Sequence, residues 1–142
     1  MKVTRKLIHL LSLRRNRSTE PTGLVPLSAL HSAVIYLDNP GDLSEPQKVS
    51  VTTFFKQYGI GISWLHAEDE ELRSSSDLFI SLALAGDIFE RYAASCSSAR
   101  FKVGRHQLKG EIYDFVMTDN GPEPVPAMEA CGVIEQFLLN IK

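Results

Sequence analysis

Residues 77–105, DLFISLALAGDIFERYAASCSSARFKVGR, decide the fold of this chain. The stretch begins with a short apolar run, passes a glycine-marked turn, continues with helical periodicity and ends in a second apolar run. Its length of about thirty residues is that of one strand–helix–strand crossover. Such a crossover joins parallel strands, and helices cover the sheet that contains them. The stretch therefore predicts an α/β fold.

A second crossover precedes this one. The apolar run His31–Leu37 predicts a buried strand, and Ser44 is placed to cap a helix that ends at Gly59. Ile60–Leu65 then predicts the next strand. The third strand is expected at Leu78–Leu84, inside the deciding stretch.

The rest of the chain completes the sheet. Phe101–Val103 predicts the fourth strand, Ile112–Met117 the fifth, and Val125–Ile141 a closing helix. These elements predict a three-layer α/β sandwich of about five mostly parallel strands, with the flavodoxin-like order 2-1-3-4-5. The stretch after the fourth strand is too short for a crossover helix, so the fifth strand is a candidate for an antiparallel edge.

Length and composition indicate one soluble domain. The chain has 142 residues, 44% of them apolar and 23% charged, and its longest early apolar run, Leu7–Leu13, is shorter than a signal peptide or membrane span requires. We expect a cytoplasmic protein, with residues 30–142 as a single domain and residues 19–29 as a linker. Cys96 and Cys131 are too far apart to predict a disulfide framework or zinc site, and core thiols are expected.

The charge is unevenly distributed. Residues 1–17 hold six of the fifteen Lys and Arg residues and none of the seventeen acids. Residues 1–18 also have helical apolar spacing, which predicts a basic amphipathic helix that docks on an anionic membrane, peripheral to the inner membrane, or on an acidic partner. The alternative is a helix that packs its leucines on the domain. The docking residues would be Lys2, Arg5, Lys6, Arg14, Arg15 and Arg17. Because the body is acidic, no nucleic-acid partner is expected.

A ligand site is predicted where the strands end. In an open parallel sheet, ligands bind beyond the carboxyl ends of the strands, and helix N-termini there can receive anions. The residues that would bind a phosphate or nucleotide diphosphate are Asp38, Asn39, Gly86, Asp87, Arg105, His106 and Asp119. The alternative is that these residues serve the turns and the helix cap. The acidic segment His66–Ser76 favours a solvated loop over a metal site.

Sequence motifs of the common enzyme and cofactor sites are absent. The chain has no dinucleotide-binding, P-loop, zinc-protease or serine-hydrolase motif, and no cofactor is expected. We therefore predict a non-catalytic interaction or docking module. The alternative is a binding domain or small enzyme for a phosphorylated or nucleotide-sugar ligand. The closing helix and the edge strands are candidates for a homodimer interface.

Four segments resemble a family of short bacterial proteins known only as a domain of unknown function. They are Asp77–Leu82 (DLFISL), Ala99–Arg105 (ARFKVGR), Tyr113–Val116 (YDFV) and Glu135–Lys142. The connection at residues 66–76 looks shorter than in that family. The resemblance implies a Rossmann-like α/β fold and a bacterial cytoplasmic protein, without a reaction. A weaker similarity, to one half of two-domain glycosyltransferases, implies a binding domain that assembles with a second copy.

Overall fold

The computed structural model describes residues 22–117 and 123–141, and it contains a five-stranded sheet with the order β2-β1-β3-β4-β5. All four neighbouring pairs are parallel. The elements are η1 (Leu27–Ala29), β1 (Ser32–Leu37), η2 (Pro40–Asp42), α2 (Glu45–Lys56), β2 (Gly61–His66), β3 (Leu78–Ser81), α3 (Ile88–Ser95), β4 (Phe101–Gly104), β5 (Phe115–Val116) and α4 (Ala127–Leu139). The predicted three-layer sandwich and strand order are confirmed.

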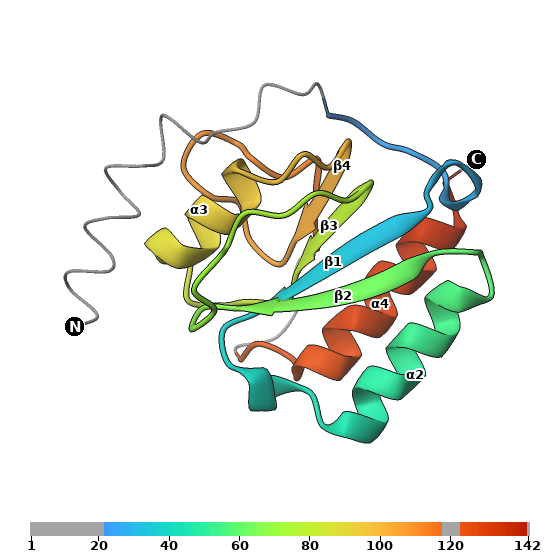
Figure 1. Ribbon diagram of the computed structural model, residues 1–142, viewed down its shortest axis with the longest axis horizontal. Coiled ribbons are helices and arrows are strands. Elements are labelled where there is room, and N and C mark those ends of the chain that lie inside the picture. The colour runs from blue at the N-terminus through green and yellow to red at the C-terminus, as the bar shows by residue number, and fades with distance from the viewer. Residues whose placement is uncertain (1–21, 118–122, 142) are drawn as a thin grey trace.

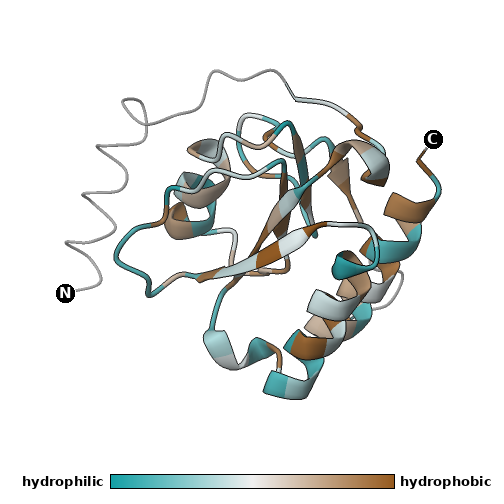
Figure 2. Ribbon diagram, turned by 45° about the vertical axis from the view of Figure 1, so that its right-hand side comes forward, coloured by the Kyte–Doolittle hydropathy of each residue, from teal (hydrophilic) through white to brown (hydrophobic). Residues whose placement is uncertain are grey.

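Helices cover both faces of the sheet, but unequally (Figure 1). One core cluster joins α2 and α4 to side chains of β1, β3 and β4, such as Ile35 and Ile80. The other joins α3 to the alternate residues of β1 and β3, such as Tyr36 and Phe79. This alternation is the two-residue period of a strand covered on both sides. Figure 2 shows the strands and α4 mainly hydrophobic and the loops mainly hydrophilic.

The helix boundaries follow the predicted caps. The Ser44 hydroxyl accepts the Gln47 backbone N–H at 3.3 Å, while the Gln47 side chain accepts the Ser44 N–H at 2.8 Å, which makes a capping box. Gly59 follows α2 with φ +73°, the left-handed conformation that glycine adopts most easily. Both cysteines are buried free thiols, as predicted.

The expectation of an antiparallel fifth strand is wrong. β5 is only two residues long and pairs parallel with β4. The connection makes this crossover without a helix because the Gln107 side chain holds it together. Its oxygen accepts the backbone N–H groups of Leu108 and Tyr113 at 3.1 and 2.9 Å, and its nitrogen donates to the Tyr113 carbonyl at 2.9 Å.

Of two predicted segments, one lies outside the described residues and the other is described only in part. The basic helix at residues 1–18 lies outside them. Of the predicted linker, residues 22–29 are described and pack on the domain: Leu27 is buried in the core, and the Gly23 N–H donates to the Arg100 carbonyl at 2.9 Å.

Candidate functional site

Polar side chains gather beyond the carboxyl ends of β1, β3 and β4. From β1 the chain adds β2 on one side of the sheet and then β3, β4 and β5 on the other. The carboxyl edge between β1 and β3 is therefore the switch point at which open α/β sheets bind ligands. Three of the predicted residues lie near each other here: Asp38 after β1, Gly86 after β3 and His106 after β4. The residue that connects Gly86 and His106 is Glu90, which the sequence did not indicate.

Glu90 is fully buried and accepts contacts on both carboxylate oxygens. Its Oε2 accepts the Tyr113 hydroxyl at 2.5 Å and the Ser81 hydroxyl at 3.1 Å. Its Oε1 accepts the Gly86 backbone N–H at 3.2 Å and lies 3.3 Å from His106 Nε2. We call these five residues the Glu90 cluster. Four polar partners offset the cost of placing a carboxylate in the interior.

Local sequence features place the members of the cluster. The Asp87 carboxylate accepts the N–H groups of Phe89 and Glu90 at 3.1 Å each, so it caps α3 and fixes Glu90 in the first helical turn. Gly104 has no side chain, and a Cβ there would lie 2.4 Å from the Tyr113 ring. Glycine at position 104 therefore lets Tyr113 pack closely enough to reach Glu90.

Burial dominates the electrostatics of the cluster. Burial raises the pKa of Glu90 above its ordinary value of 4.5, and Asp38 adds to the rise, while hydrogen bonds from Tyr113 and Ser81 and the His106 charge oppose it. Burial, and then the neighbouring Glu90 charge, raise the pKa of Tyr113 well above its ordinary value of 10.0. Tyr113 therefore keeps its proton and donates a hydrogen bond to Glu90. His106 retains 34% side-chain exposure and connects the cluster with solvent.

The backbone amides that follow β3 are occupied by the protein's own carboxylates. Asp38 Oδ2 accepts the N–H groups of Leu84 and Ala85 at 2.8 and 3.2 Å, and Glu90 takes the N–H of Gly86. The other Asp38 oxygen, Oδ1, is buried without a hydrogen-bond partner among the described residues. A phosphate at this edge would have to compete with these carboxylates for the same amides.

Arg105 connects three parts of the fold. Its side chain is buried, and its guanidinium donates to the Val125 carbonyl at 2.6 Å and to the Leu82 carbonyl at 3.4 Å. It thereby joins the end of β4 to the segments that follow β3 and precede α4. Buried carbonyls need donors, and this side chain supplies two.

The other predicted site residues have separate positions. Asn39 caps η2, where its N–H donates to the Asp42 carboxylate at 3.0 Å. Asp119 and the basic residues Lys2, Arg5, Lys6, Arg14, Arg15 and Arg17 lie outside the described residues. The acidic segment contains an Asp69 carboxylate 3.2 Å from His66 Nε2, and residues 22–117 and 123–141 hold no group of three His, Cys, Asp or Glu side chains arranged for a metal ion.

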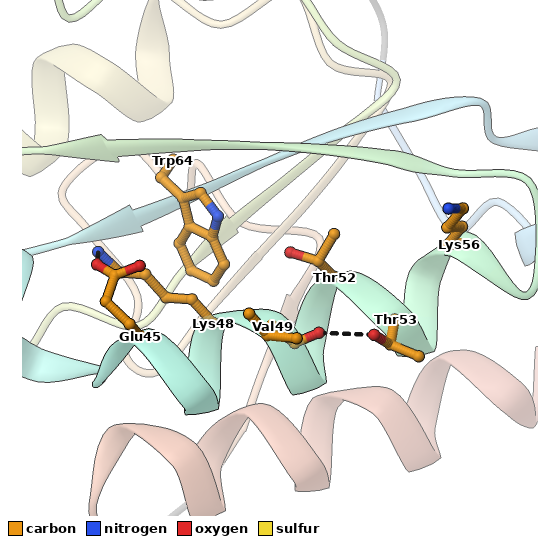
Figure 3. Close-up of a pocket in the computed structure, with 7 residues that line it drawn as sticks. All are labelled: Glu45, Lys48, Val49, Thr52, Thr53, Lys56 and Trp64. Atoms are coloured by element: carbon orange, nitrogen blue, oxygen red, sulfur yellow. Dashed lines mark hydrogen bonds and ion pairs between the residues drawn. The ribbon is translucent and has the colours of Figure 1, made fainter.

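Two pockets lie away from the Glu90 cluster. A pocket of about 330 Å³ beside Ser32 and Arg100 opens at the amino ends of the strands. A groove of about 490 Å³ runs between α2 and β2 (Figure 3). We call it the α2–β2 groove; it is lined by Glu45, Lys48, Val49, Thr52, Thr53, Lys56 and Trp64.

Comparisons with family models, with curated proteins and with solved structures found no match to this chain. The resemblance to the family of short bacterial proteins therefore stays a prediction. No helix within the described ranges is long and apolar enough to span a membrane.

Proposed function

We propose that this chain is a non-catalytic docking domain that holds a basic segment against an anionic membrane surface. The observation that carries the proposal is the charge distribution: six positive side chains within residues 1–17, against nine bases and seventeen acids in the remainder. Each basic residue near an anionic leaflet contributes about 1 kcal/mol of attraction. An acidic body is repelled by the same leaflet, which favours contact through the basic segment.

The carboxyl edge of the sheet supports this proposal indirectly. The backbone amides that could bind a phosphate already donate to the carboxylates of Asp38 and Asp87. The Arg105 guanidinium already donates to the Val125 carbonyl. The polar groups there stabilise loops and a helix start.

Co-sedimentation with vesicles tests the docking proposal. We compare the full chain on phosphatidylcholine vesicles with and without a quarter of phosphatidylserine, at low and high salt. The expected result is binding only to the anionic vesicles and loss of binding at high salt, because the charges are then screened. Neutralising Arg14, Arg15 and Arg17 to glutamine should weaken binding by about 100-fold, from the loss of ~3 kcal/mol.

A matched variant controls for total charge. Arg73, Arg91 and Lys109 changed to glutamine remove the same charge from the body and should leave vesicle binding nearly unchanged. Equal loss in both triple variants would mean that overall charge, and not the basic segment, drives binding. Absence of binding by the full chain at low salt would refute the membrane surface as the docking partner.

A second candidate function rests on His106. This side chain is partly exposed, lies 3.3 Å from a carboxylate oxygen of the buried Glu90, and is at the edge where Asp38 Oδ1 has no donor among the described residues. We propose, as the alternative, that a phosphorylated or nucleotide-sugar compound binds there. In a thermal-shift screen, a ligand at 100 times its Kd adds about 2.7 kcal/mol. His106→Ala should remove the shift and His31→Ala should keep it; a shift unaffected by His106→Ala would place the ligand elsewhere.

A further inference from the structure

β2 is the long outer strand of the sheet. It has six residues and pairs only with β1 in the part of the chain that the structure describes, whereas the opposite outer strand, β5, has two residues (Figure 1). The pairing of β1 and β2 runs without interruption from Ser32 and Gly61 to Leu37 and His66, so no bulge turns the strand away. An outer strand of this length presents backbone groups to any second strand.

The hydrogen bonds to β1 identify the residues that face outward. The N–H groups of Gly61 and Ala67 donate to the carbonyls of His31 and Leu37 at 3.0 and 3.3 Å. Because bonding alternates along a parallel strand, the even-numbered residues of β2 direct their backbone groups away from β1. The N–H of His66 is taken by the Asp69 carboxylate at 2.9 Å. Ile62 and Trp64 remain to pair outward.

Within residues 22–117 and 123–141, the outer edge of β2 lacks the usual protections against pairing. Residues 61–65, GISWL, contain no charge and no proline. Natural proteins commonly protect an exposed edge with lysine, proline, a bulge or a very short strand. β5 uses the last of these, and β2 uses none of them between Gly61 and Leu65.

We propose that β2 pairs antiparallel with β2 of a second copy of this chain, around a two-fold axis at Ser63. In this register Ile62 of each copy faces Trp64 of the other, and both outward residues of both copies are hydrogen-bonded. With the axis at Ile62, Trp64 would face Ile60, which lies outside β2. With the axis at Trp64, Ile62 would face His66, whose N–H is already taken by Asp69. A two-fold contact is the commonest symmetry of homo-oligomers.

The charges beside the strand favour a second copy as the occupant. α2 flanks β2 across the α2–β2 groove and carries Glu45 in its first turn and Lys56 in its last, both exposed (Figure 3). A two-fold axis at Ser63 sets the two α2 helices antiparallel, so Glu45 of each copy approaches Lys56 of the other. Val49, which is 63% exposed, lies between these charges and is covered in the same contact. This interface is independent of the docking proposal.

Trp64 supplies a direct probe, because it is the one tryptophan of the chain and lies in the α2–β2 groove. We expect analytical ultracentrifugation of the full chain to give twice the chain mass of 15.8 kDa at high concentration. Over the same dilution series, Trp64 emission should shift to the red as the dimer dissociates. A chain that keeps its single mass at every concentration would refute the proposal.

Ser63 is the position for the decisive variants, because it is exposed and sits on the proposed axis. Ser63→Lys places two like charges opposite each other and should raise the dimer Kd at least tenfold; Ser63→Glu should do the same. An equimolar mixture of the two variants should regain the dimer mass, since opposite charges then meet. Ser50→Lys, an exposed serine of α2 outside the groove, should leave the mass unchanged.

These variants separate this interface from other occupants. Circular dichroism first verifies that both Ser63 variants fold. A dimer that persists in Ser63→Lys, or a mixture that stays monomeric, would contradict pairing at β2. Vesicle binding is measured separately, so loss of the dimer with retained vesicle binding would leave the docking proposal intact, and the reverse result would leave the dimer intact.

Discussion

Glu90 is the residue whose environment is most unusual in this fold. A carboxylate in the interior costs several kcal/mol unless donors surround it; here hydroxyl and amide groups donate to it, and the His106 imidazole lies 3.3 Å away. Removing any one donor therefore leaves a buried oxygen less satisfied. The cluster is a sensitive point of the molecule whether or not a ligand binds beside it.

The first prediction concerns the shortest contact of the cluster. Tyr113→Phe removes the 2.5 Å hydrogen bond to Glu90 Oε2 and should lower the free energy of unfolding by about 1.5–3 kcal/mol, the usual range for a bond to a charged group. It should also raise the pKa of Glu90 further, because this bond lowers it. Urea unfolding and carboxyl NMR titration measure the two effects. Tyr58→Phe, at a 42% exposed position, should change neither.

The second prediction concerns Gly86 and the histidine beside it. Gly86 has φ +60°, and an added Cβ would lie 2.7 Å from the Cε1 atom of His106. Gly86→Ala should therefore destabilise by the ~1–2 kcal/mol of left-handed strain and also displace the imidazole from Glu90. Gly59→Ala has similar strain, at φ +73°, with open space around it.

NMR of the His106 ring distinguishes these two glycine variants. The ring signals should move in Gly86→Ala and stay in place in Gly59→Ala. Equal unfolding free energies with unmoved His106 signals in both would show that the contact at Gly86 is unimportant.

At the scale of elements, α3 is the one helix that covers its face of the sheet in the described structure. It has eight residues, which is too short for stability by itself, so its cap and packing hold it in place. Asp87 supplies that cap with two hydrogen bonds.

The third prediction tests the cap. Asp87→Ala should lower the free energy of unfolding by about 1 kcal/mol, the usual effect of losing an N-cap acceptor. Asp87→Asn keeps an acceptor oxygen and should stay close to the parent chain in urea unfolding. If both variants lose the same stability, the charge of Asp87, and not its capping bonds, would be what matters.

The elements that could be predicted from the sequence are those with local signals. Ser44, Gly59 and Asp87 mark helix ends by rules that involve only nearby residues, and the apolar runs mark the inner strands. The direction of β5 could not be predicted, because the Gln107 side chain, and not a crossover helix, holds the connection between β4 and β5. Its hydrogen bonds join Gln107 to Tyr113, and these two residues meet only when the connection is folded.

The location of the candidate site at the carboxyl edge could be predicted, but its central residue, Glu90, could not. Asp38, Gly86 and His106 were expected at the carboxyl edge, and they lie there. Glu90 was missed because a glutamate within a helix usually faces solvent, and Tyr113 because its approach depends on Gly104, nine residues earlier. A polar Ser81 inside an apolar strand was the available signal that a buried polar group lay opposite.

At the scale of the whole molecule, one buried and one half-buried acid contribute to how stability depends on pH. A group whose pKa is raised on folding binds its proton more tightly in the folded state. Its contribution is fully present below its unfolded pKa and is lost as the pH rises through its folded pKa. Glu90 and Glu135 both have raised pKa values, for which burial is the main cause.

The fourth prediction follows from that sign. As the pH rises above 4.5, these two groups should make the free energy of unfolding decrease, and Glu90→Gln should make this decrease smaller. Urea unfolding at several pH values measures the slope. Glu70→Gln, an exposed acid, should keep the parent slope. A slope that Glu90→Gln leaves unchanged would mean that Glu90 has the same pKa in both states.

The central position of β1 also has a consequence for synthesis of the chain. β1 is paired on both sides, with β2 and β3, and both partners follow it in sequence. At about 5–20 residues per second, the uncharged segment SAVIYL waits for seconds after translation before both neighbours exist. Such a segment is prone to self-association while it is unpaired. Nascent chains stalled before Leu78 should therefore depend on chaperones more strongly than the completed domain does.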